Sequence, residues 1–272
     1  VSIRAQGLSI GRITESLIGP RGRTLFHIII FFLIALAMGV FVHIIATLFS
    51  PDFYPESVLP STLLIGIALA IGIGMYRRQW GLVPLTVFGF VAMFFMVTVG
   101  IRYPIVGPSL AEWKWLLLGY AFLASALPVW LLLQPRDYIN SLFLYAGVGA
   151  MYLGFLFANP SFVAPAVNLH PEGAPAMLPF VFIVIACGAA SGFHALVSSG
   201  TSAKQLDKET DARFVGYGAM LGESVLGLMA VLACTAGSVS RDEWLSRYEN
   251  WQTADNLGNN IAVFVGGTST FL

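Results

Sequence analysis

Charged residues are scarce in this 272-residue chain: they make up 10% of it, whereas hydrophobic residues make up 57%. A soluble globular protein carries about 25% charged residues, so a water-soluble fold would leave most of this surface apolar. The composition therefore predicts an integral membrane protein. The 14 basic and 14 acidic residues balance to a net charge of zero, so no basic face favours nucleic acid as a partner.

Cysteine and the common ligand-binding motifs are also scarce. The two cysteines, Cys187 and Cys234, both lie in apolar segments, and we interpret them as buried small residues rather than a disulfide. The sequence contains no C-x-x-C, no H-x-x-x-H and no G-x-x-x-x-G-K-[ST] motif. It therefore gives no support for a metal site, for ATP binding or for a cofactor.

The chain is rich in long apolar runs. A membrane-spanning helix needs about 20 such residues, and a backbone in lipid must satisfy its own hydrogen bonds, which favours helices over strands. The predicted fold is an all-α polytopic bundle, a single transmembrane domain over 1–272 whose seven helices occupy 24–236. A partial eighth helix begins at 261. The seven predicted spans are 24–50, 58–76, 81–101, 113–133, 138–158, 177–200 and 214–236.

The connecting segments carry their basic residues unevenly. Ten lie in 1–23, 77–80, 134–137 and 201–213, and four lie in the segments on the other side. Because cytoplasmic loops carry an excess of Lys and Arg, we expect 1–23 to be cytoplasmic and 237–260 to be an extracytoplasmic loop. The chain starts at Val1 and ends in a short apolar run over 261–272, so we expect it to be an internal part of a longer protein.

Glu223 lies about ten residues into its predicted span, near mid-membrane at a rise of 1.5 Å per residue. Placing a carboxylate there costs about 3 kcal/mol on insertion scales, so such a residue usually faces a bundle interior or a water path. We predict that Glu223 carries a proton. The alternative is a protonated side chain that only bonds a neighbouring helix.

A second polar region, "CGAASGFHALVSSGTS", follows an apolar run at 187–202. Its glycines weaken a helix, its hydroxyls offer hydrogen bonds, and its histidine titrates near neutral pH. We predict a discontinuous helix over 188–201 that lines a cavity, with His194 also serving proton coupling. Small-residue packing between helices is the alternative. The predicted substrate-binding residues are Ser191, Gly192, His194, Ser198, Ser199 and Thr201.

A third region reads "LPVWLLLQPRDYIN". We expect Pro128 to kink the fourth span and Pro135 to end it. Arg136 and Asp137 would then start the next helix, either as a headgroup anchor and a helix cap or as part of a gate. In the second interpretation Lys204, in the charged segment 201–213, belongs to the same gate.

The string "SGFHALVSSGTSAKQLDKETDARFVGYGAMLGES", together with "LPVWLLLQPRDYIN", resembles the carbon starvation protein family, CstA. "IGRITESLIGPRGRTLF" fits more loosely, and the stretch after 237 resembles the family least. The resemblance implies a bacterial or archaeal inner-membrane protein, similar to secondary transporters of the amino acid–polyamine–organocation type. It also implies uptake of peptides or of pyruvate during carbon starvation, driven by protons.

Three function classes follow from these features. The leading one is a transporter, not an enzyme, that moves small peptides or carboxylates across the bilayer with protons. An intramembrane serine hydrolase would use Ser191 and His194, but no acid that would orient the histidine is obvious in the sequence. A starvation sensor would need cytoplasmic domains. The sequence does not specify an oligomeric state.

Overall fold

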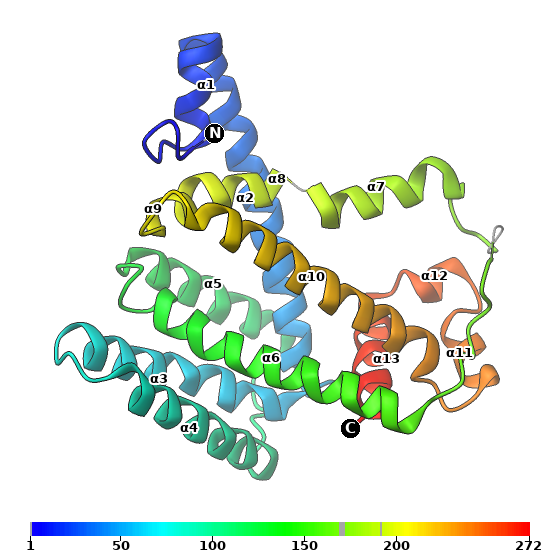
Figure 1. The fold of residues 1–272 in the computed structure, drawn as a ribbon. Helices are drawn as coiled ribbons and strands as arrows, with labels where there is room; N and C mark the ends of the chain where they lie inside the picture. Colours follow the sequence, from blue (N-terminus) through cyan, green and yellow to red (C-terminus); the bar gives the residue numbers. More distant parts are fainter. Residues whose placement is uncertain (1, 169–171, 191) are drawn as a thin grey trace. The chain divides into compact units, whose positions relative to one another are not determined.

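The computed structural model describes residues 2–168, 172–190 and 192–272, and every regular element in these ranges is helical (Figure 1). Two elements are not α-helices: η1 (Pro55–Ser57) is a short 3₁₀ turn and η2 (Ser198–Ser202) is a π-helix. The α-helices are α1 (Ile10–Ile18), α2 (Pro20–Phe49), α3 (Val58–Tyr76), α4 (Leu82–Arg102), α5 (Leu110–Ala126), α6 (Leu133–Ala158), α7 (Met177–Ala190), α8 (Gly192–Val197), α9 (Ala203–Gln205), α10 (Asp211–Ala236), α11 (Arg241–Arg247), α12 (Trp251–Ala254) and α13 (Leu257–Ser269).

Within the part of the chain that the structure describes, five helical segments are long and apolar enough to cross a membrane: α2, η1 with α3, α4, α6 and α10. They confirm the prediction of an all-helical, multi-pass membrane protein. The two other predicted spans are not among them: α5 has 17 residues, and the described part of the predicted span 177–200 is interrupted at residue 191, which lies outside the described residues. The predicted partial eighth span corresponds to the 13-residue α13. The structure thus confirms the helical class but not the count of seven spans.

The break between α5 and α6 differs from the prediction. α5 ends at Ala126, and Leu127 has extended backbone angles (φ −83°, ψ 146°), as a residue before proline prefers. Pro128 therefore follows the helix and does not kink it. The prediction that Pro135 ends a helix was wrong, because Pro135 lies in the first turn of α6, where its missing N–H removes no helical hydrogen bond. Asp137 consequently lies inside α6 rather than at its cap.

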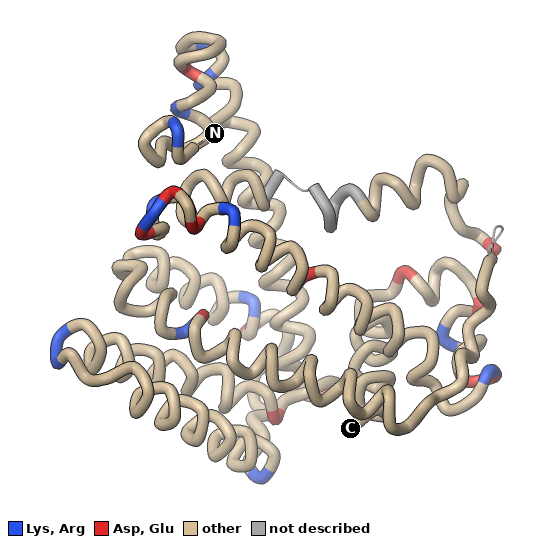
Figure 2. The backbone as a smooth tube through the Cα atoms, in the orientation of Figure 1, with Lys and Arg blue, Asp and Glu red and all other residues tan. Residues whose placement is uncertain are grey.

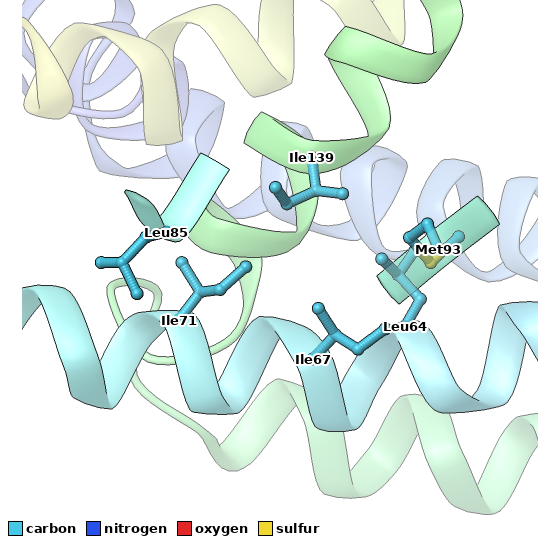
Figure 3. Close-up of a cluster of buried hydrophobic side chains, with 6 residues drawn as sticks. All are labelled: Leu64, Ile67, Ile71, Leu85, Met93 and Ile139. Carbon is cyan, nitrogen blue, oxygen red and sulfur yellow. The ribbon is translucent and has the colours of Figure 1, made fainter. Parts of the chain in front are cut away.

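The chain divides into two compact units, one formed by 1–38 with 152–272 and the other by 39–151. Both boundaries fall inside long helices, α2 and α6. The unit 39–151 has a core made by α3, α4 and α6 (Figure 3), whose side chains are Leu64, Ile67, Ile71, Leu85, Met93 and Ile139. A Cβ atom on Gly89 would lie 2.9 Å from Ile71 Cδ1, so glycine is what lets α4 pack this closely.

In the unit 1–38 with 152–272, small residues join the C-terminal half of α10 to α13. A Cβ atom on Gly267 would collide with the carbonyl oxygen of Ala233, and one on Gly237 would collide with Gly267 Cα. The Thr270 hydroxyl donates to the carbonyl oxygens of Gly237 (3.1 Å) and Gly267 (2.7 Å). We call this contact the glycine seam. It holds two helix backbones at a distance that larger residues would prevent.

Candidate functional site

The central feature of the candidate site is a pair of titratable side chains on α8 and α10. Nε2 of His194 lies 3.2 Å from Oε1 of Glu223, within hydrogen-bond distance. Glu223 is the thirteenth of the 26 residues of α10, an apolar helix long enough to span a membrane. Both side chains are about half exposed, at 52% and 57%. A protonated imidazole would form an ion pair with the carboxylate here, whereas a neutral one would form a hydrogen bond.

The segment that carries His194 changes from one helix type to another. α8 continues to Val197, and the π-helix η2 follows directly at Ser198–Ser202. A π-helix widens the turn by one residue, is uncommon, and occurs frequently at functional sites. Helical order therefore changes type within the predicted discontinuous segment 188–201. Ser191 lies outside the described residues.

The predicted substrate-binding hydroxyls differ in their surroundings. Ser198 and Ser199 donate to the carbonyl oxygens of Ala195 (3.2 Å) and Leu196 (3.3 Å) in the preceding turn. Ser199 is also buried, so its hydroxyl serves the local backbone in this conformation. Thr201 is exposed, and its hydroxyl accepts and donates no hydrogen bond among the described residues. Among the described members of the predicted set, Thr201 is thus the hydroxyl that the local backbone does not engage.

The N-terminal residues form a turn that packs on the π-helix. The Ser2 hydroxyl lies 2.8 Å from the carbonyl oxygen of Leu8 and 3.1 Å from that of Ser199, so it closes the turn and bonds it to η2. Both serines are buried. Gly7 adopts a positive φ of 74°, and a Cβ atom there would lie 3.4 Å from Lys204 Cγ. We call residues 2–9 the N-terminal turn.

A polar pocket of about 370 Å³ lies between the N-terminal turn and the segment after η2. Lys204, one of the three predicted gate residues, lines this pocket. The other two, Arg136 and Asp137, belong to the unit 39–151, where Nη1 of Arg136 donates to the Tyr120 hydroxyl at 3.2 Å. The lining residues are Ile3, Gln6, Gly7, Ala203, Lys204, Leu206, Asp207, Lys208 and Glu209.

Sequence reasoning missed two residues near the site. The Tyr152 hydroxyl, at the end of α6, donates to the carbonyl oxygen of Val225 at 2.7 Å, two residues after Glu223. Ser2 was the other, because it lies 197 positions from its partner Ser199. Neither residue has a local sequence signal, since a tyrosine in an apolar helix and a serine in a turn are common. Among the described residues, no cluster of three His, Cys, Asp or Glu side chains could hold a metal.

Comparison with known proteins shows which family and which named proteins this chain is similar to. The family described as "Carbon starvation protein CstA" matches residues 1–254. "Pyruvate/proton symporter BtsT" of Escherichia coli is 36% identical over 248 residues, which are 86% of this chain and 34% of that protein. "Peptide transporter CstA" of Helicobacter pylori is 38% identical over 187 residues, or 63% of this chain and 27% of that protein.

A third relative, "Peptide transporter CstA" of Bacillus subtilis, is 35% identical over 247 residues, covering 86% of this chain and 41% of that protein. The chain thus spans about a third of the length of these relatives. No solved structure matches it.

Proposed function

This chain belongs to the carbon starvation protein CstA family, and we propose that it is part of a secondary active transporter that imports small peptides or pyruvate-like carboxylates with protons. Relatives named as peptide transporters and as a pyruvate/proton symporter support a transporter of this kind. The observation that carries proton coupling is the contact of His194 on α8 with Glu223, which lies inside the apolar helix α10. The proposed setting is the inner membrane during carbon starvation, with residues 1–23 in the cytoplasm.

Glu223 is the proposed proton carrier. A membrane carboxylate is costly when charged and is typical of proton relays in transporters. A nearby imidazole offers two states for it: an ion pair when the histidine is protonated and a hydrogen bond when one of the pair is neutral. Proton movement through the pair would change the charge beside the substrate. This change of charge would couple movement of the proton to movement of the substrate.

The substrate is proposed to bind along the irregular segment 192–202. Interrupted helices in transporters expose backbone groups to anionic or zwitterionic ligands. Gly192, His194 and Thr201 are the described residues that would contribute most, and Ser198, Ser199 and Ser191 complete the proposed set. The buried hydrogen bond of Ser199 means that it would join only after η2 rearranges.

The N-terminal turn is the proposed cytoplasmic gate of this segment. It bonds directly to η2 through Ser2, and the pocket between them contains Lys204. Release of substrate towards the cytoplasm would then require the turn to separate from η2. Arg136 and Asp137, in the unit 39–151, are also proposed as gate residues.

The proposed topology has seven spans and a partial eighth, in the manner of amino acid–polyamine–organocation transporters. At about 1.5 Å per residue, α5 is about 25 Å long, close to a hydrocarbon thickness of about 30 Å. The segment from α7 to α9 covers 177–205 and would cross as one interrupted span. α13 would begin the eighth.

The test is uptake of labelled pyruvate and of a labelled dipeptide into proteoliposomes that hold the full-length protein, with a pH gradient imposed and then collapsed. We expect accumulation of at least one substrate that depends on the gradient. A folded protein that accumulates neither substrate under any gradient would contradict the proposed function. Accumulation that survives collapse of the pH gradient would contradict proton coupling alone.

A further inference from the structure

The turn between α3 and α4, in the unit 39–151, is held rigidly. The backbone N–H groups of Arg77 and Arg78 donate to the carbonyl oxygen of Ile73 at 2.9 and 3.2 Å, and that of Trp80 donates to Gly74 at 3.0 Å. Gln79 adopts a positive φ of 52°, which reverses the chain. A Cβ atom on Gly74 would lie 3.1 Å from Trp80 Cε3, so this glycine lets the indole pack on α3.

An apolar groove of about 320 Å³ lies beside this turn. Leu85 in its wall belongs to the buried core and is 4% exposed, whereas Trp80 and Phe88 at its edge are each about half exposed. The groove is therefore preformed by packed residues and open along one side. Its lining residues are Ala70, Trp80, Pro84, Leu85 and Phe88.

The turn between α3 and α4 carries basic residues, drawn blue in Figure 2, directly before the groove residue Trp80. The guanidinium carbon of Arg78 lies 5.7 Å from the centre of the Trp80 ring, which itself lines the groove. Arg77 and Arg78 are both exposed, and neither forms an ion pair within the described part of the chain. Both cations lie at the ends of α3 and α4, two helices that are apolar enough to span a membrane. Neither cation has a carboxylate partner in the described part of the chain.

We propose that this groove binds one anionic phospholipid, with an acyl chain against Trp80, Leu85 and Phe88 and the phosphate on Arg77 and Arg78. Headgroups lie at the ends of spanning helices, where tryptophan is also favoured. Basic residues next to such helices attract anionic lipids, and basic pockets between helices bind their headgroups. The charge at the rim favours this occupant over an apolar helix, which would leave both arginines unpaired. The proposal does not depend on the transported substrate.

The test is quenching of Trp80 fluorescence by brominated lipids, with the full-length protein in phosphatidylcholine vesicles. Phosphatidylglycerol with dibrominated acyl chains is titrated in, and brominated phosphatidylcholine serves as the comparison. Subtracting the signal of Trp80→Phe isolates the Trp80 component. We expect phosphatidylglycerol to quench this component at a lower mole fraction than phosphatidylcholine does.

Variants separate the headgroup from the acyl contact. Arg77→Gln and Arg78→Gln should each lower the preference for phosphatidylglycerol by about fivefold, since one basic residue near an anionic surface contributes about that factor. Arg102→Gln, at the opposite end of α4, should leave the preference unchanged. Ala70→Phe should fill the groove and reduce quenching by both lipids.

Three results would overturn the proposal. Equal quenching by the two brominated lipids would indicate ordinary lipid contact without a site. The absence of quenching by either lipid would show that protein covers the groove. A preference that survives removal of both arginines would place the anionic lipid elsewhere.

Discussion

Nε2 of His194 and Oε1 of Glu223 lie 3.2 Å apart, although the two residues are 29 positions apart in the sequence. The contact joins α8, which leads into a π-helix, to the midpoint of the 26-residue apolar helix α10. A protonated imidazole would form an ion pair with the carboxylate, whereas a neutral one would form a hydrogen bond, so protonation would change the strength of this contact. In the proposed function, the pair would thus connect the binding of a proton to the position of α8 and η2.

Replacing Glu223 by Gln removes the group that would carry the proton but keeps the size and a hydrogen-bonding oxygen. We expect Glu223→Gln to lose accumulation driven by a pH gradient and to retain exchange of labelled for unlabelled substrate. Both are measured in the same proteoliposomes. Glu223→Asp is the matched control, because it keeps the carboxylate. Full gradient-driven uptake by Glu223→Gln would exclude this residue as the carrier.

Joining the N-terminal turn covalently to the segment after η2 should block transport. A Cβ atom on Gly7 would lie 3.4 Å from Lys204 Cγ, the position in the side chain that the sulfur of a cysteine occupies, so we choose Gly7→Cys and Lys204→Cys as the pair to crosslink. We expect oxidation to crosslink the pair and stop uptake, and reduction to restore it.

The single variant Lys204→Cys controls for the loss of the lysine. The single variant Gly7→Cys controls for the strain of a cysteine at a positive φ. Uptake that continues at a normal rate through a complete crosslink would show that the turn does not move during transport.

Two adjacent glycines of α13 should respond to alanine in opposite directions. A Cβ atom at Gly267 collides with the carbonyl oxygen of Ala233, whereas one at Gly266 meets nothing within 4 Å. Overpacking costs about 1–3 kcal/mol, whereas Gly to Ala in an open helical position gains about 0.5–1 kcal/mol. Thermal unfolding should therefore rank Gly266→Ala above wild type and Gly267→Ala below it. Equal melting temperatures for the two variants would contradict the glycine seam.

The start of α5 should make stability depend on pH. Oε2 of Glu112 accepts from the backbone N–H of Ser109 at 2.7 Å and from its hydroxyl at 2.8 Å, and these bonds lower the pKa of the carboxyl below 4.5. The carboxylate therefore contributes stability above pH 4.5, and this contribution is lost as the pH falls through the lowered pKa. The melting temperatures of wild type and Glu112→Gln should differ at pH 7 and converge in acid. A difference in melting temperature that stays constant with pH would contradict this contribution of the Glu112 carboxylate.

Long apolar runs were sufficient to predict most helices, because each run has to satisfy its backbone locally in lipid. The expected spans 81–101 and 138–158 correspond to α4 and to most of α6. The break between α5 and α6 was misplaced, because Pro135 suits the first turn of a helix as well as the position after its end. Hydropathy does not distinguish these two cases.

The candidate site was likewise predicted only in part. Glu223 and His194 stood out individually, because the cost of a titratable group in an apolar run is a property of each position. Their contact depends on how α8 and α10 are rotated about their own axes, which local patterns do not encode. The bond from Ser2 to Ser199 depends on the path of the whole chain between them. Roles for the proposed binding and gate residues stay predictions.

The glycine seam also divides α10 into two differently packed parts. Met229, Ala233 and Ala236 are buried, whereas every residue from Arg213 to Val225 is exposed in the described structure. The exposed part is held by side chains, through the Tyr152 hydroxyl at Val225 and His194 at Glu223. Close backbone packing is confined to the seam, so the helix carries its titratable Glu223 where side-chain contacts alone hold it.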